Sequence, residues 1–144
     1  MLIGEYKHTL DEKRRLALPV KFRKSLGKTI IITRGLDSSL FVFSQTEWRS
    51  IVEKLNRLSM GQADSRAFAR YFFAGATEVE IDRLGRILVP AELVVHANLT
   101  SKVVLIGVND RCEIWSDERW ESYRTSVEKE ADRVAQALGE IGVL

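Results

Sequence analysis

The chain has 144 residues, of which 45% are hydrophobic, and this composition predicts a packed domain rather than a disordered chain. Its formal net charge is only +2, it has one cysteine, and no apolar run approaches the roughly 20 residues that span a bilayer. These features exclude an internal disulfide, a multi-cysteine metal site and a transmembrane helix, and they favour a cytoplasmic protein with no membrane partner.

Charge is distributed unevenly along the chain. Between Lys7 and Lys28, eight basic residues stand against two acidic ones, a balance of +6. From Asp110 to Glu140 there are nine acids and five bases, a balance of −4. A basic end and an acidic end predict one side that faces a polyanion and another that is turned away from it. On charge alone, a solvated basic surface without a partner is the alternative.

The predicted elements follow the same order in both halves: strand, turn, strand, helix, strand, strand, helix. Strands are expected at 6–10, 16–18, 29–33 and 40–43, and again at 78–81, 87–89, 103–106 and 112–115. Pro19 and Pro90 fit the first turn of a short helix, where a missing N–H costs nothing. Longer helices are expected from about 46 to 58 and from 117 to 138, and a connecting helix between the halves.

The turn between the first two strands carries a motif that occurs twice. Asp11 and Arg15 recur 71 positions later as Asp82 and Arg86, and Pro19 recurs as Pro90. After a slip of one residue, further landmarks match in a register of 72: Gly35 with Gly107, Phe43 with Trp115, Ser44 with Ser116, and Trp48 with Trp120. Two copies are too few for a solenoid and predict a pseudo-twofold pair that shares one core. We expect a first repeat at 1–58, a connecting helix at 59–74, and a second repeat with the C-terminal helix at 75–144.

These paired Asp-x-x-x-Arg turns, each followed by an apolar strand and a helix that starts at proline, resemble those of the bacterial MraZ transcriptional regulators. The resemblance implies an α+β fold with a mostly β core, a swapped-hairpin barrel similar to the AbrB-type DNA-binding domain, with both halves in one chain and flanking helices. It also implies a ring-like homo-oligomer at the nucleoid. The implied partner is double-stranded DNA, namely tandem promoter repeats of the division and cell-wall gene cluster, including the protein's own gene.

Carried over position by position, the resemblance implies that Arg15 and Arg86 read DNA, with Asp11 and Asp82 as their motif partners. The chemistry agrees, because an arginine just after a tight turn can extend its planar fork toward guanine O6 and N7. Neighbouring basic residues are expected at the DNA, most of them at phosphates: Lys7, Lys13, Arg14, Lys21, Arg23, Lys24 and Arg83. The alternative is that both Asp–Arg pairs only stabilise their turns.

The two turns differ at one position, where the first has Arg14 and the second has Gly85. Since glycine adopts positive φ easily and arginine does not, we expect the two turns to differ in shape. Either the halves then contact DNA unequally, or Arg14 supplies an additional phosphate contact.

No pattern of catalytic or metal-ligating residues stands out. His8 and His96 occupy non-equivalent positions, and Cys112 aligns with Leu40, which favours a core position. We therefore expect no enzyme activity, cofactor, metal or small-molecule substrate.

Two other functions stay open: an assembly module that uses the C-terminal helix without DNA, and an AbrB-fold antidote to a toxin partner. That helix has an apolar seam long enough to pack on its own core or on a neighbouring subunit, formed by Trp120, Tyr123, Val127, Ala131, Val134 and Leu138.

Overall fold

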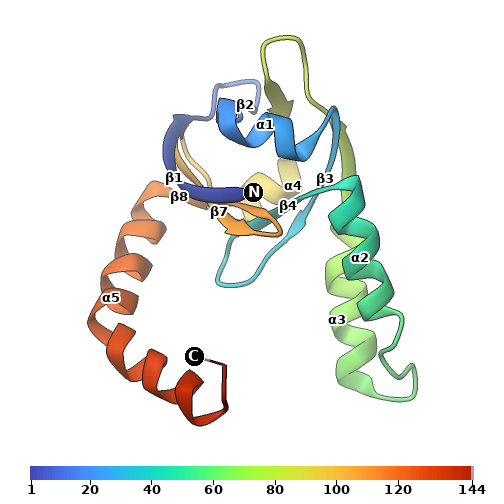
Figure 1. Cartoon of the computed structure of the whole chain (residues 1–144). Coiled ribbons are helices and arrows are strands. Elements are labelled where there is room, and N and C mark those ends of the chain that lie inside the picture. The colour runs from blue at the N-terminus through green and yellow to red at the C-terminus, as the bar shows by residue number, and fades with distance from the viewer. Residues whose placement is uncertain (144) are drawn as a thin grey trace.

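The structure is a computed structural model that describes residues 1–143, and it has an α+β fold with a mostly β core (Figure 1). The predicted order of elements is confirmed, with bounds that shift by a few residues. The strands are β1 (Leu2–Thr9), β2 (Arg15–Ala17), β3 (Thr29–Arg34), β4 (Leu40–Ser44), β5 (Thr77–Glu80), β6 (Arg86–Leu88), β7 (Lys102–Asn109) and β8 (Cys112–Ser116). The helices are α1 (Val20–Leu26), α2 (Gln45–Leu55), α3 (Ala63–Ala74), α4 (Ala91–His96) and α5 (Asp117–Glu140).

Six strands form one antiparallel sheet in the order β1-β7-β8-β4-β3-β5, and β2 pairs with β6 in a separate two-stranded ribbon. The halves exchange strands, because the first strand of each half pairs with the third strand of the other: β1 with β7, and β5 with β3. β4 and β8 pair with each other in the middle of the sheet. This arrangement is symmetric about the β4–β8 pair, so neither half completes its sheet alone.

The core lies between the inner face of the sheet and the ribbon. Leu16 in β2 and Ile87 in β6 face each other across the ribbon, and both are buried in the same cluster as Ile30 and Ile32 of β3. Cys112 is fully buried in this cluster, as its alignment with Leu40 predicts. Burial raises the pKa of its thiol well above the ordinary range, so this cysteine is a packing residue.

The two short helices that follow the ribbon strands begin one residue later than predicted. Pro19 and Pro90 precede α1 and α4 as N-cap residues, and their carbonyls accept the first helical hydrogen bonds. Both helices close the core, with Phe22 of α1 and Leu93 of α4 buried at matching positions. The prolines therefore fix where each ribbon strand ends.

The longer helices pack on the outer face of the sheet at the ends that adjoin it (Figure 1). Trp48 of α2 packs on Phe43 of β4, with ring centroids 5.8 Å apart, and Trp120 of α5 packs on Trp115 of β8 at 5.3 Å. Helix α3 folds back along α2, and its Phe72 stacks on Trp48 at 5.4 Å. The two tryptophans thus occupy equivalent packing positions, as the repeat predicts.

Helix α5 leaves the sheet after its first turns (Figure 1). Tyr123 still packs on Trp115, with ring centroids 4.9 Å apart, but beyond it the apolar seam is open to solvent, with Val127 41% and Val134 40% exposed. The seam therefore does not pack along its own core. Among the described residues, no helix is both long and apolar enough to cross a membrane.

Candidate functional site

The first Asp–Arg turn joins β1 to β2 and is held by a single aspartate. Asp11 Oδ1 accepts hydrogen bonds from the backbone N–H groups of Lys13, at 2.8 Å, and of Arg15, at 2.9 Å. Asp11 Oδ2 accepts a hydrogen bond from Arg15 Nε at 2.8 Å. One carboxylate thus closes the turn and fixes the direction of the arginine that follows it.

The second turn joins β5 to β6 and repeats this pattern. Asp82 Oδ1 accepts from the N–H groups of Leu84, at 2.8 Å, and of Arg86, at 2.9 Å, and Asp82 Oδ2 accepts from Arg86 Nε at 2.9 Å. Each turn also has a backbone bond from its fourth residue to the aspartate carbonyl, 3.0 Å from Arg14 and 2.9 Å from Gly85. The two halves thus build the same local geometry.

The expectation that the two turns differ in shape is wrong. Arg14 has φ of 61° and Gly85 has φ of 76°, so both lie in the left-handed region. Arginine is strained at this φ, but the hydrogen bonds to Asp11 hold the turn in place. The Arg14 side chain gains a partner of its own, since its Nε donates to the carbonyl of Val89 at 3.1 Å.

Both carboxylates are stabilised in their charged form. The backbone N–H of Arg15 lowers the pKa of Asp11, and the backbone N–H of Arg86 lowers that of Asp82 in the same way. The guanidinium groups add to the effect, while partial desolvation opposes it. At neutral pH each turn therefore carries a carboxylate paired with a guanidinium.

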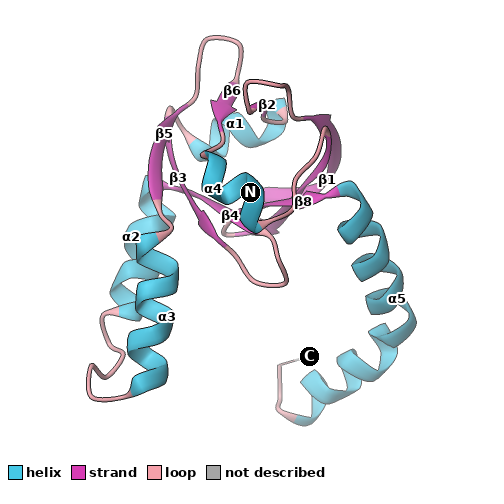
Figure 2. Cartoon of the chain, turned by 180° about the vertical axis from the view of Figure 1, so that it is seen from behind, coloured by secondary structure: helices cyan, strands magenta, loops and turns pink. Residues whose placement is uncertain are grey.

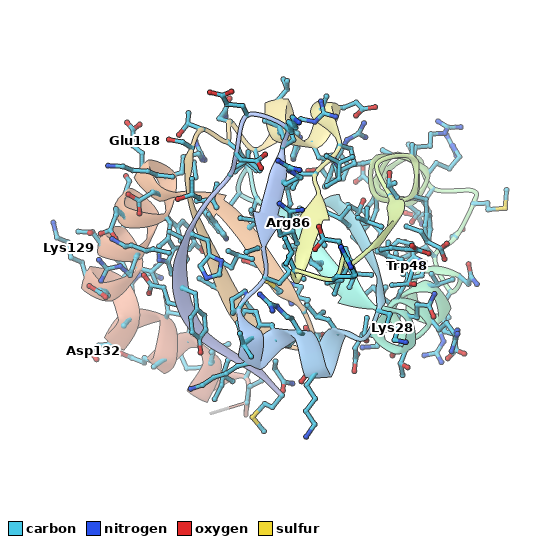
Figure 3. All side chains as sticks on the ribbon, turned by 90° about the horizontal axis from the view of Figure 1, so that it is seen from above. Lys28, Trp48, Arg86, Glu118, Lys129 and Asp132 are labelled. Atoms are coloured by element: carbon cyan, nitrogen blue, oxygen red, sulfur yellow. The ribbon has the colours of Figure 1, made fainter. Side chains whose placement is uncertain are left out.

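The two turns lie at the same end of the molecule. Figures 1 and 2 show the loops before β2 and β6 projecting from one end of the sheet core, while the α2–α3 pair and α5 extend the other way. β2 and β6 are hydrogen-bonded neighbours, with Ala17 opposite Arg86 and Arg15 opposite Leu88. Figure 3 looks down on this end, with Arg86 near its centre. The structure thus brings the two halves of the motif, which are 71 residues apart, onto one short ribbon.

Both motif arginines reach solvent. The Arg15 side chain is 37% exposed and the Arg86 side chain 30% exposed. Only Nε of each is bonded to the aspartate, which leaves the terminal nitrogens of the fork available at the surface. This is the arrangement that bidentate contact with an outside acceptor requires.

The other predicted site residues fall into three settings. Lys13 and Arg83 are exposed in the turns beside the motif arginines. Arg14 is half-buried and bonded to Val89. Lys7 lies on β1, and its ammonium is 3.7 Å from carboxylates of both Asp117 and Glu121 at the start of α5. The structure therefore groups Lys13, Arg14 and Arg83 with the turns and pairs Lys7 with α5.

Sequence reasoning missed how Arg23 is used. Its Nε donates to the carbonyl of Leu18 at 3.0 Å, and its guanidinium fills the space that a side chain at Gly85 would occupy. The glycine in the second turn was a usable signal, since it marks a close approach as well as a positive φ. What approaches it could only be known from the fold.

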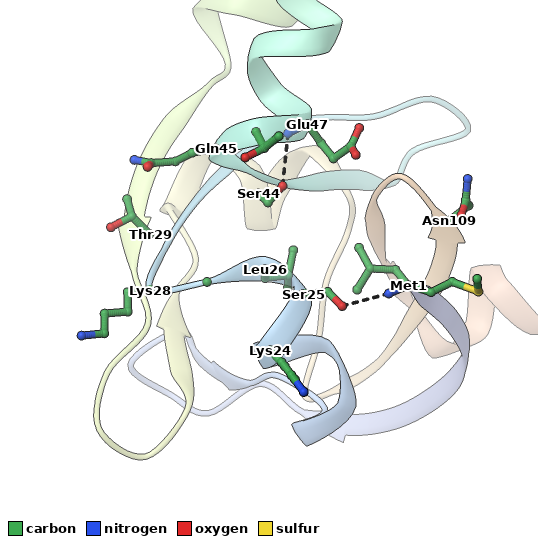
Figure 4. A pocket seen from close by; sticks show the side chains of 13 residues that line it. Met1, Lys24, Ser25, Leu26, Lys28, Thr29, Ser44, Gln45, Glu47 and Asn109 are labelled. Carbon is green, nitrogen blue, oxygen red and sulfur yellow. Dashed lines mark hydrogen bonds between the residues drawn. The ribbon is translucent and has the colours of Figure 1, made fainter.

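A polar hollow of 710 Å³ lies elsewhere, where the end of α1 meets the start of α2 (Figure 4). Its groups largely satisfy one another: the Met1 ammonium donates to Ser25 Oγ at 3.1 Å, and Ser44 Oγ accepts from the Glu47 N–H at 3.2 Å. Within residues 1–143, no three His, Cys, Asp or Glu side chains gather closely enough to hold a metal ion. The two turns therefore remain the candidate site.

Comparison with known proteins agrees with the duplicated turns. A family model described as "MraZ protein, putative antitoxin-like" matches residues 1–71 and again residues 72–139. A protein of Caldicellulosiruptor saccharolyticus named transcriptional regulator MraZ is 48% identical over 143 residues, which cover 99% of this chain and all of the relative. Proteins of the same name from Caldanaerobacter subterraneus and Ligilactobacillus salivarius are each 46% identical, over 99% and 96% of this chain and 100% and 96% of their own lengths. The chain therefore belongs to the MraZ family.

Proposed function

We propose that this protein is a sequence-specific DNA-binding transcriptional regulator that reads DNA with Arg15 and Arg86. The observation that carries this proposal is the matched geometry of the two Asp–Arg turns on one ribbon. The names of the relatives support the regulatory role. The proposal includes no enzymatic activity and no cofactor.

Each guanidinium has two sets of donors, Nε and the terminal nitrogens, and only Nε is used within the turn. This division suits the arginine to contact a base. The aspartate binds Nε and fixes the plane of the fork, so little conformational entropy is lost when the terminal nitrogens bind a ligand. Guanine presents two acceptors, O6 and N7, at a spacing that suits this fork in the major groove. Asp11 and Asp82 are thus proposed as positioning residues and the two arginines as the base contacts.

Phosphate contacts are proposed for the exposed cations at the same end. Lys13 and Arg83 lie within the turns, and Lys21 and Lys24 are exposed on α1. These side chains supply affinity and register without sequence information. Lys7 is omitted from this set because its ammonium faces Asp117 and Glu121.

The finer assignments follow the family resemblance. We propose the AbrB-like swapped-hairpin barrel, which the exchange of β1 and β5 between the halves supports. We keep the division into 1–58, 59–74 and 75–144. The proposed targets are tandem repeats in the promoter of the division and cell-wall gene cluster, including the protein's own gene, bound in the cytoplasm at the nucleoid.

Self-association into a ring-like homo-oligomer is proposed through α5. Helix α3 covers the apolar side of α2, whereas the seam of α5 beyond Tyr123 is exposed at Val127, Val134 and Leu138. An apolar stripe of this length suits a helix of a second copy. An assembly module without DNA binding is the second candidate, and this seam is the observation that favours it.

The test compares Arg86→Ala with Lys21→Ala on promoter-repeat DNA and on scrambled DNA. Arg86→Ala should reduce the discrimination between the two DNAs by about 1–3 kcal/mol, because it removes a base contact. Lys21→Ala should weaken binding to both DNAs alike and make the salt dependence shallower. Fluorescence anisotropy over a range of salt concentrations measures both effects.

Lys129→Ala on α5 is the matched control, since it removes a positive charge far from the turns (Figure 3). It should leave both affinities unchanged. Unchanged discrimination in Arg86→Ala would refute the assignment of this arginine. A wild-type chain that binds both DNAs equally would favour the assembly module.

A further inference from the structure

Two backbone carbonyls at the ends of the ribbon strands each receive a guanidinium. Arg14 Nε donates to the carbonyl of Val89 at 3.1 Å, and Arg23 Nε donates to the carbonyl of Leu18 at 3.0 Å. Leu18 and Val89 are equivalent in the repeat and both are fully buried. The donors are not equivalent, because Arg14 lies in the first turn and Arg23 lies in α1.

The same two residues join the halves through their backbones. The N–H of Leu18 donates to the carbonyl of Gly85 at 2.9 Å, and the N–H of Val89 donates to the carbonyl of Arg14 at 2.8 Å. The fourth residue of each turn is therefore bonded to the strand end of the other half. Each guanidinium adds a charge-assisted bond at one of these crossings.

The difference between Arg14 and Gly85 follows from this arrangement. At the second turn, the Arg23 guanidinium occupies the space that a side chain would need, so any residue other than glycine would have to displace it. At the first turn, Val94 stands at the position equivalent to Arg23 and has no donor, and Arg14 supplies the guanidinium itself. The two halves thus reach the same bond by different routes.

We propose that Arg14 and Arg23 are positioning residues that lock the two DNA-reading turns to each other, rather than phosphate contacts. Their bonds end on buried carbonyls that need a partner and fix where each turn starts relative to the opposite strand. A small displacement of a reading group costs much of its selectivity. This inference rests on the proposed function, because it takes Arg15 and Arg86 as the base contacts.

The symmetry of the two halves supplies a rescue experiment. Arg14→Gly keeps the left-handed φ but removes the guanidinium, and it should lower the preference for promoter-repeat DNA over scrambled DNA at least about fivefold. Adding Val94→Arg should restore the preference, since it rebuilds in the first half the glycine-plus-arginine pair of the second. The readout is the ratio of the two affinities at one salt concentration, with melting curves to confirm folding.

The matched control is Arg14→Gly combined with Val95→Arg. Val95 is the next residue on the same helix and is 75% exposed. Val95→Arg therefore adds the same charge as Val94→Arg, but on a side chain that faces solvent instead of the Val89 carbonyl. This variant should not regain the preference. Equal rescue by Val94→Arg and Val95→Arg would show a purely electrostatic role and overturn the inference.

Arg23→Lys provides a second arm should Arg14→Gly fail to fold. It keeps the charge but loses the planar fork, so a positioning role predicts a lost preference, whereas a phosphate contact predicts near wild-type binding. A wild-type chain that prefers the repeats, together with an Arg23→Lys variant that keeps this preference, overturns the inference alone. A wild-type chain with no preference overturns the proposed function, and the inference with it.

Discussion

At the scale of single residues, each motif aspartate uses its two oxygens for different purposes. Oδ1 accepts two backbone N–H groups and closes the turn, while Oδ2 holds the arginine Nε. An asparagine can keep the first set of bonds through its carbonyl oxygen, but it has no charge to orient the guanidinium. The two contributions can therefore be separated by one substitution.

Asp82→Asn should destabilise the fold in a pH-dependent way. The backbone N–H of Arg86 lowers the pKa of Asp82 below its ordinary value of 3.8 in the folded chain, so the ionised carboxylate stabilises the native state. The difference in the free energy of unfolding between wild type and variant should have its largest value above pH 3.8. It should shrink as the pH falls through the folded pKa. Urea denaturation at a series of pH values measures it.

Asp132→Asn on α5 corrects this comparison for the loss of one carboxylate far from the turns (Figure 3). A difference between wild type and Asp82→Asn that stays constant down to the lowest accessible pH would contradict the assigned role of the charge.

The sequence predicts these residues well, but not their mutual arrangement. Asp11, Arg15, Asp82 and Arg86 follow from the repeat, because identical spacing implies identical local bonds. The conformation of Arg14 did not follow, since local preference disfavours positive φ and the compensating bond ends on a residue 75 positions away. The role of Arg23 could not be predicted for the same reason, because it depends on strands that are brought together from the two halves.

At the scale of elements, α2 and α5 begin alike and end differently. Each is capped by a serine whose Oγ accepts a hydrogen bond from a backbone N–H: Ser44 accepts from Glu47, and Ser116 accepts from Arg119. α2 is covered by α3, whereas α5 continues for 24 residues with its seam open. The periodicity of apolar residues predicts an apolar side for both helices, but it cannot tell which helix finds a partner within the chain.

Val127→Glu combined with Val134→Glu should dissociate the proposed oligomer. Both valines lie on the α5 seam and are exposed in the single chain, so the substitutions cost little in the monomer. In an apolar interface, two unpaired charges should raise the dissociation constant at least about a hundredfold. Sedimentation velocity over a range of protein concentrations measures the change.

Thr125→Glu combined with Gln136→Glu is the matched control, because it adds the same charge on the opposite side of the helix. This variant should keep the wild-type oligomeric state. Equal dissociation by both pairs would point to general charge repulsion instead of a defined seam.

At the scale of the whole molecule, the proposed reading turns and the proposed assembly helix lie at opposite ends. The turns project from one end of the sheet core and the long helices extend from the other (Figures 1 and 2). One protomer offers the two arginines proposed to read DNA, and two base contacts alone bind weakly. Several protomers held side by side on evenly spaced repeats gain affinity through effective concentration. Because α5 and the turns lie at opposite ends, an oligomer formed through α5 would leave the turns uncovered.

DNA with several repeats should therefore bind the wild-type chain about a hundredfold or more tightly than DNA with one repeat. In the Val127→Glu and Val134→Glu double variant this gain should vanish, because each protomer then binds alone, while the preference for one repeat over scrambled DNA persists. Arg86→Ala should show the reverse pattern, since it keeps the assembly and loses the reading contact. Electrophoretic mobility shifts on matched DNA lengths measure all three ratios. A seam variant that keeps the full gain would show that repeats are bound independently of α5, and would separate the oligomer from DNA recognition.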